Sequence, residues 1–220
     1  MRSFFIFLLA FIFAFNSSGQ SREAFNSMER IAHQGLRIIE EQQISGNPYL
    51  DREFKPALIV KKNDSEITNM SLRYNIFKNI MEFKQKETLL YIADPITIDH
   101  IILDNKVFVY APYKASKKIK RSYFQLIASG NFQLLKKYNS VLKKSDPKEG
   151  TPTRFEDSKP DYYLRYKDGT AKQITTRKEL IKIIQPIPKE IIDYIQQQKI
   201  KVYDETELIS TIKYINKSTD

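Results

Sequence analysis

The chain has 220 residues and a formal net charge of +10, and it contains no cysteine, no tryptophan and two histidines. Because cysteine is absent, disulfide frameworks, thiolate metal sites and cysteine nucleophiles are excluded. Two histidines are also too few for a multi-histidine metal centre. Hydrophobic residues make up 41% of the chain, which is typical of a globular protein and not of a disordered one.

The first 19 residues have the pattern of a secretory signal peptide. Arg2 precedes an uninterrupted apolar run over residues 4–15, and Ser17 and Gly19 suit the −3 and −1 positions of a cleavage site. As a helix the run would rise about 18 Å, well short of the roughly 30 Å of a hydrocarbon core. We therefore expect an exported protein, periplasmic or secreted, with peripheral envelope association and no transmembrane span after cleavage.

The mature chain is predicted to begin with a helix and to continue as a sheet. Residues 22–44 carry apolar side chains at helical spacing, which predicts an amphipathic helix that covers a sheet of its own domain. Residues 45–48 (Ser-Gly-Asn-Pro) end that helix. Short β-rich segments separated by Asn and Asp turns then predict an antiparallel meander and not βαβ units. The predicted strands are 57–62, 67–75, 81–83, 88–92, 96–103, 107–110, 123–128, 132–138, 162–166 and 171–174.

The last part of the chain is predicted to be helical, and a long loop precedes the last two strands. Residues 145–161 are rich in Pro and polar side chains, which is typical of a loop. Thr176 and Asp204 are each followed three residues later by Glu, the spacing of a capping box. The predicted fold is α+β: an N-terminal helix, a curved antiparallel meander of about 8–10 strands, and a C-terminal cap of short helices. Three segments are expected: a signal peptide over 1–19, helix and sheet over 20–175, and a helical cap over 176–220 packed on the same domain.

The sequence contains no motif of a known catalytic site. It has no Walker loop, no Gly-x-Ser-x-Gly elbow and no His-Glu-x-x-His. His33 lies four residues after Glu29, and this pair alone is not sufficient for a metal site. His100 follows Asp99 on a predicted strand, so the side chains of Asp99 and His100 should point to opposite faces. No enzyme, cofactor or metal is therefore expected, and a hydrolase acting through two distant carboxylates is the one catalytic alternative.

The strongest functional signal is a basic segment over residues 114–148. One acid, Asp146, stands there against ten basic residues, so this segment has a net charge of +9: Lys114, Lys117, Lys118, Lys120, Arg121, Lys136, Lys137, Lys143, Lys144 and Lys148. A two-residue turn at residues 130–131 would place Phe124 opposite Lys137 and, if the ladder continues, Lys118 opposite Lys143. Such a surface predicts a contact site for an envelope polyanion, a lipid or an acidic protein. The alternative is a solvated edge whose lysines block strand addition.

Several short motifs resemble those of a family of exported proteins of the Gram-negative envelope that has no assigned activity. They are residues 46–50 (Gly-Asn-Pro-Tyr-Leu) with Phe54, 73–75 (Arg-Tyr-Asn), 81–83 (Met-Glu-Phe), 123–124 (Tyr-Phe), 134–135 (Leu-Leu), 162–164 (Tyr-Tyr-Leu) and 214–216 (Tyr-Ile-Asn). Ala57 departs from the family, which has Gly after the Pro. The resemblance implies an envelope location and no catalytic residues. Residues 103–110 are similar to a strand pair in periplasmic lipoprotein carriers of half-barrel fold.

Two functions follow from these observations. The first is a non-enzymatic, exported envelope-binding module with a basic contact surface at 114–148. The second is a periplasmic carrier of an apolar, lipid-like ligand within the curved sheet. Nucleic acid is not an expected partner, because the aromatic residues among the lysines alternate as core-facing strand residues do.

Overall fold

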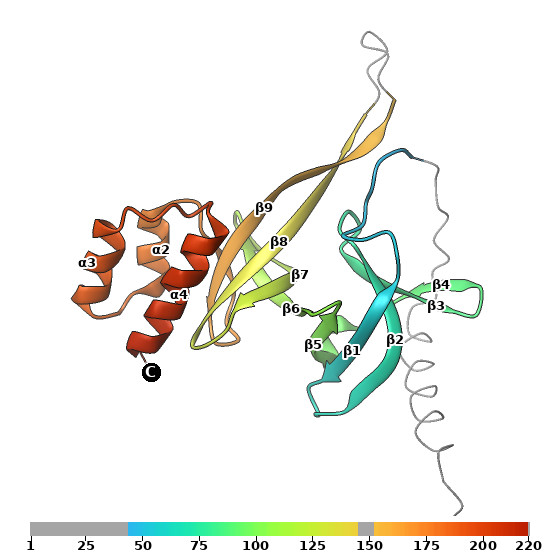
Figure 1. The fold of residues 1–220 in the computed structure, drawn as a ribbon, viewed down its shortest axis with the longest axis horizontal. Coiled ribbons are helices and arrows are strands. Elements are labelled where there is room, and N and C mark those ends of the chain that lie inside the picture. The colour runs from blue at the N-terminus through green and yellow to red at the C-terminus, as the bar shows by residue number, and fades with distance from the viewer. Residues whose placement is uncertain (1–43, 145–151, 220) are drawn as a thin grey trace, which may run out of the picture.

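The computed structural model describes residues 44–144 and 152–219. Ten antiparallel strands form one curled, half-barrel sheet in the order β10-β9-β8-β7-β6-β5-β1-β2-β3-β4, and three helices follow it (Figure 1). The strands are β1 (Lys55–Lys61), β2 (Glu66–Asn75), β3 (Ile80–Gln85), β4 (Thr88–Tyr91), β5 (Ile98–Leu103), β6 (Lys106–Ala115), β7 (Lys118–Ala128), β8 (Phe132–Lys143), β9 (Arg154–Tyr166) and β10 (Lys172–Gln173). The helices are α2 (Arg177–Ile184), α3 (Lys189–Gln197) and α4 (Glu205–Thr219).

These elements confirm an α+β fold dominated by an antiparallel sheet and ending in short helices. Apart from Ile44, the helix predicted over 22–44 lies outside the described residues, as does the predicted signal peptide. The sheet is not one continuous meander. After β4 the chain passes through the short 3-10 helix η1 (Pro95–Thr97), and β5 then pairs with β1 instead of with β4.

The N-terminal half of the sheet curls around its own core. Ile67, Met70, Leu72 and Tyr74 of β2 all point into this core. Strict alternation would separate Ile67 from Met70, but β2 carries an extra residue there: Asn69 adopts a φ of 58° and the register with β1 shifts. Such a bulge bends the strand and re-aims its side chains, so β2 keeps its apolar residues inside the curl.

The C-terminal half of the sheet closes into a small barrel formed by β6 to β10. β5 pairs with β6 only as far as Phe108, which leaves the rest of that edge of β6 to another segment. Ala171, just before β10, takes this edge: its N–H donates to Pro112 O (2.8 Å), and Lys114 N donates to Ala171 O (3.0 Å). The barrel interior is filled by Val109, Ala111, Phe124, Leu135, Tyr163 and Ala171.

Two of the three helices cover one face of β7, β8 and β9: α4 contacts β7 and β8, α2 contacts β9, and α3 packs on α2 and α4. Their residues Leu180, Ile191, Ile195, Leu208, Ile212 and Ile215 share one buried cluster with Leu134, Tyr162 and Leu164. Both predicted caps are present, because Thr176 Oγ1 accepts from Glu179 N (3.2 Å) and Asp204 Oδ1 accepts from Glu207 N (3.1 Å). In Figure 1 this cap lies to one side of the sheet, away from β1–β4.

The predicted loop over 145–161 is wrong in its second part. β9 begins at Arg154 and pairs with β8 out to Lys143, and together they form the long ribbon that extends beyond the rest of the sheet in Figure 1. Both faces of an extended two-stranded ribbon can meet solvent, so its residues need no apolar alternation. That is why a sequence rich in Asp, Glu, Lys and Ser forms a strand here.

Candidate functional site

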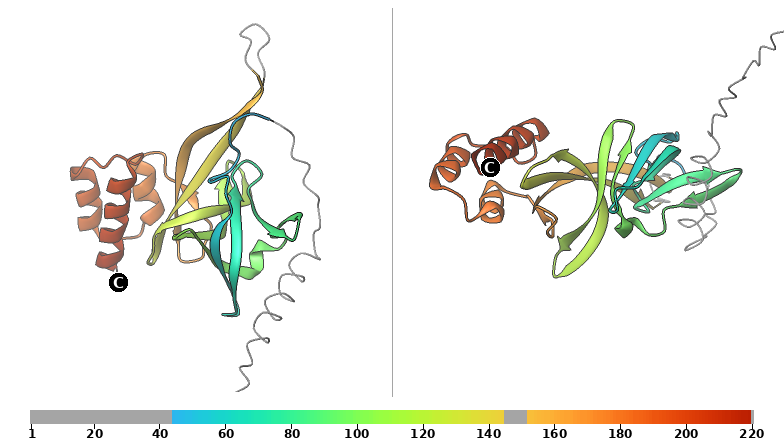
Figure 2. Two further views of the ribbon diagram at one scale, coloured as in Figure 1. Left: turned by 45° about the vertical axis from the view of Figure 1, so that its right-hand side comes forward. Right: turned by 90° about the horizontal axis from the view of Figure 1, so that it is seen from below.

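The end of the β6–β7 hairpin carries five exposed basic side chains: Lys114, Lys117, Lys118, Lys120 and Arg121. Residues 114–121 are termed the hairpin tip. Within the described part of the chain none of these five side chains forms an ion pair with a carboxylate. In the right-hand view of Figure 2 the yellow-green hairpin projects from the sheet. The tip is therefore a concentrated, accessible positive charge.

The strand register distributes the tip residues over two faces. Lys114 lies opposite Ile119, and Arg121 follows two residues later in the same strand, so these three share one face. Lys118 and Lys120 lie on the other face. Ile119 is 61% exposed, so cations surround an apolar side chain in solvent. The sequence reasoning missed Ile119, although its place between two lysines is visible in the sequence.

The basic residues of β8 differ from those of the tip because two of them pair with a carboxylate, although Glu156 is shared between Lys143 and Arg154. Lys136 Nζ lies 2.7 Å from Glu205 Oε2 of α4. Lys143 Nζ lies 2.6 Å from Glu156 Oε2 of β9. Two further basic residues of the segment 114–148 follow β8: Lys144 is exposed, and Lys148 lies outside the described residues.

The predicted register of β7 and β8 holds for Gln125 with Lys136 and for Leu126 with Leu135, and it shifts by one residue at Ala128, which lies opposite Leu134. The β7–β8 ladder stops before the expected pair of Phe124 and Lys137. Beyond that point β8 pairs with β9, and Lys143 lies opposite Arg154 and not opposite Lys118. The expected single cluster of both runs at the open end of one hairpin is thus wrong.

One polar cluster, termed the barrel mouth, does join the two runs at an end of the small barrel. Its members are Tyr113, Lys120, Lys137, Asn139, Asp161, Tyr163 and Gln173. Lys137 Nζ donates to Asn139 Oδ1 (2.8 Å), and the two oxygens of Asp161 accept from Asn139 Nδ2 and Gln173 Nε2, both at 3.0 Å. Each Asp161 oxygen therefore already accepts an amide hydrogen, which makes this carboxylate a structural acceptor.

The charges of the barrel mouth act on one another. Burial lowers the pKa of Lys137; Asp161 opposes that shift and the Lys120 charge adds to it. Burial, and after it Asp161, raises the pKa of Tyr163 to about 12. Apart from Lys120, which belongs to the hairpin tip, the mouth holds one cation and one carboxylate, so it adds no net charge to the tip.

Residues of three N-terminal motifs, 46–54, 73–75 and 81–83, meet in a buried network in the N-terminal half of the sheet. Glu82 is 0% exposed and accepts from Arg73 Nε (2.8 Å) and from Asn75 Nδ2 (3.0 Å). Arg73 also donates to Tyr49 Oη (2.8 Å), and its guanidinium carbon lies 3.9 Å from the Tyr49 ring centroid and 4.8 Å from that of Phe54. These interactions hold three segments together, which is a structural role for the motif residues.

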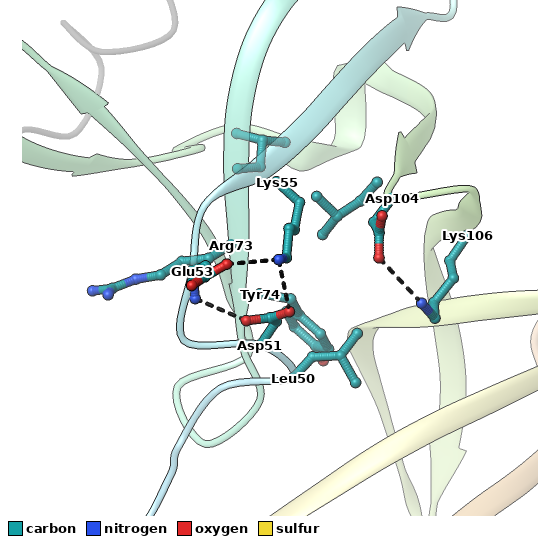
Figure 3. A pocket seen from close by; sticks show the side chains of 10 residues that line it. Leu50, Asp51, Glu53, Lys55, Arg73, Tyr74, Asp104 and Lys106 are labelled. Atoms are coloured by element: carbon teal, nitrogen blue, oxygen red, sulfur yellow. Dashed lines mark hydrogen bonds and ion pairs between the residues drawn. The ribbon is translucent and has the colours of Figure 1, made fainter.

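A pocket of about 120 Å³ lies beside this network, against Leu50, Leu72, Tyr74 and Leu103 (Figure 3). Charged side chains at its rim pair with one another: Lys55 Nζ lies 2.8 Å from Glu53 Oε2 and 3.3 Å from Asp51 Oδ2. The hydrogen bonds to Glu53 and Asp51 raise the pKa of Lys55. Since this rim satisfies its own charges, the pocket is a weaker candidate than the hairpin tip.

Of the two histidines, the structure describes only His100. His100 Nδ1 lies 2.7 Å from Asp99 Oδ2, which corrects the expected opposite orientation; the register of β1 and β5 is irregular next to this pair. His33 lies outside the described residues. No group of three or more His, Asp or Glu residues within 44–144 and 152–219 could hold a metal ion.

No helix in the described segments is long and apolar enough to cross a membrane. No protein-family model, no curated protein and no solved structure matches the chain. The likeness to the envelope family and to the half-barrel carriers therefore stays a prediction, and the hairpin tip is the feature of the molecule that bears on function.

Proposed function

We propose that the chain is an exported, non-enzymatic binding module whose contact surface is the hairpin tip. One observation carries this proposal: five exposed basic side chains lie within residues 114–121 with no carboxylate partner among the described residues. The cations of β8 provide an internal comparison, because Lys136 and Lys143 each lie within 2.7 Å of a carboxylate. The contact surface is thus narrower than the basic segment 114–148.

Clustered like charges repel one another, so an anionic partner would relieve a cost that the free protein carries. A local concentration of one sign of charge also raises the encounter rate with oppositely charged partners. The chemistry of the tip suits an envelope polyanion, a lipid surface or an acidic protein. No bound cofactor is needed for such a contact.

Edge protection is the competing explanation for these lysines. The β7–β8 ladder begins only at Gln125, so residues 118–124 of β7 have no strand partner on that side. Lysines on such an edge hinder the addition of a foreign strand. Both roles use the same charges, and an anion-binding measurement separates them.

A heparin column provides that measurement, since heparin is a soluble polyanion without an apolar phase. The tip variant is Lys118→Gln with Lys120→Gln. The control is Lys178→Gln with Lys182→Gln, two exposed lysines on α2 that lie outside the contact surface. We expect the tip variant to elute at a lower salt concentration than the control, because it removes charges from the contact surface. Equal elution of the two variants would contradict the proposal.

Carriage of an apolar ligand is the second candidate, and the curled half-barrel sheet favours it. Its inner face, however, is filled by the buried side chains of Tyr74, Phe83 and Phe108. A carrier would have to open this core to admit a ligand. Native mass spectrometry of protein purified without detergent tests this function: a retained lipid mass would favour carriage, and a bare polypeptide mass would contradict tight carriage.

A further inference from the structure

Ile119 is the feature of the hairpin tip that charge alone does not explain. Its side chain is 61% exposed, compared with 48% for Ile96 and 45% for Val141, the other strongly exposed aliphatic side chains of residues 44–144 and 152–219. Ile119 lies near the end of a projecting hairpin, opposite Lys114 and two residues from Arg121. A soluble polyanion could neutralise these cations, but it would leave Ile119 in water.

We infer that the hairpin tip docks end-on on an anionic lipid bilayer, so that Ile119 enters the interface and the cations on both faces of the hairpin contact lipid phosphates. This inference rests on the proposed function and names its partner. A bilayer surface is the partner that supplies both parts of the match, because its phosphate layer lies directly over an apolar layer. An acidic protein or a polysaccharide supplies the negative charge without that ordered pair of layers.

The two components of the contact have different expected sizes. A basic residue near an anionic membrane surface contributes about fivefold to the partition coefficient. Replacing Lys118 and Lys120 together should therefore lower vesicle binding about 25-fold. Ile119→Ala removes three carbon atoms that would be partly buried in the interface, so we expect a loss of about tenfold.

The experiment measures co-sedimentation of the mature protein with vesicles of phosphatidylcholine alone and of phosphatidylcholine with phosphatidylglycerol. We expect binding to the anionic vesicles, a loss of about tenfold on Ile119→Ala, and no change on Ile96→Ala, the matched exposed isoleucine of η1. Thermal unfolding of each variant checks that the exposed substitutions leave the fold intact.

The heparin column separates this inference from the function on which it rests. Ile119→Ala should bind vesicles more weakly and still elute from heparin with the unchanged protein, because the charge is the same. If Ile119→Ala binds anionic vesicles as well as the unchanged protein does, bilayer docking is overturned while the heparin result still decides the polyanion-binding function. If Lys118→Gln with Lys120→Gln changes neither measurement, both proposals are wrong.

Discussion

Replacement of Glu82 by Gln tests the buried network in the N-terminal half of the sheet. The Glu82 carboxylate is 0% exposed and accepts from Arg73 and Asn75. Glutamine keeps the size of the side chain but removes the charge, and the Arg73 side chain, 11% exposed, has little access to solvent. Removing one partner of a buried ion pair costs about 3–5 kcal/mol. Arg73 keeps its hydrogen bond to Tyr49, so we expect a loss of about 3 kcal/mol.

Urea denaturation measures this loss as a lower midpoint, which should fall by about 1 M or more for a slope of about 2–3 kcal/mol/M. The control is Asp193→Asn, which breaks an exposed pair with Lys189 (3.0 Å) and should cost less than about 0.5 kcal/mol. If Glu82→Gln is no more destabilising than Asp193→Asn, the network does not stabilise the fold and the reasoning about its burial is wrong.

Three further substitutions test other parts of the fold. Gly46→Ala should destabilise by about 2 kcal/mol, since Gly46 has a φ of +88° and an added Cβ would lie 2.2 Å from Phe155 O; an unchanged urea midpoint would contradict this. Asn216→Ala should lower the free energy of unfolding by about 3 kcal/mol, because the buried amide accepts from Phe132 N and donates to two carbonyls of the β7–β8 turn. A loss below about 1 kcal/mol in urea denaturation would refute that role. Tyr123→Phe should stabilise by about 1 kcal/mol at pH 7, since the Tyr123 hydroxyl is buried with no hydrogen-bond partner among the described residues. Burial also raises the pKa of Tyr123 well above 10, so its proton stays bound in the folded state while the unfolded chain ionises; stability should fall above about pH 10, and less steeply in Tyr123→Phe.

The parts of the fold that local sequence determines could be predicted. The caps of α2 and α4 are such parts, because Thr176 and Asp204 bond to backbone groups three residues away. In each of these cases the interacting groups are close in sequence.

The parts that depend on distant segments could not be predicted. β7 and β8 separate after Lys136, while β8 stays paired with β9 on its other edge from Phe132 to Lys143, and nothing local to β8 indicates this. Closure of the small barrel depends on the backbone of Ala171, whose side chain carries no distinctive signal. Glu82 would be expected on a solvent face, and it is buried because Arg73 lies directly across the strand pair.

The candidate site was predicted in its charge but not in its shape. The sequence indicates a basic segment with two runs, and the structure divides them into an unpaired hairpin tip and a ribbon whose lysines are partly neutralised by Glu205 and Glu156. The acids that make this distinction lie outside residues 114–148. A count of charges along the chain therefore overestimates the number of basic side chains that have no carboxylate partner.

Ile119 also bears on whether the tip only protects a strand edge. Edge protection needs charged side chains along residues 118–124 of β7, and Lys118, Lys120 and Arg121 supply them. An exposed isoleucine between them weakens that protection, because β-branched apolar residues favour the addition of a strand. If edge protection were the sole role, Ile119→Gln would lower self-association and leave binding to vesicles unchanged. If the tip contacts a bilayer, the same substitution removes the apolar part of the contact, so vesicle binding falls whatever happens to self-association.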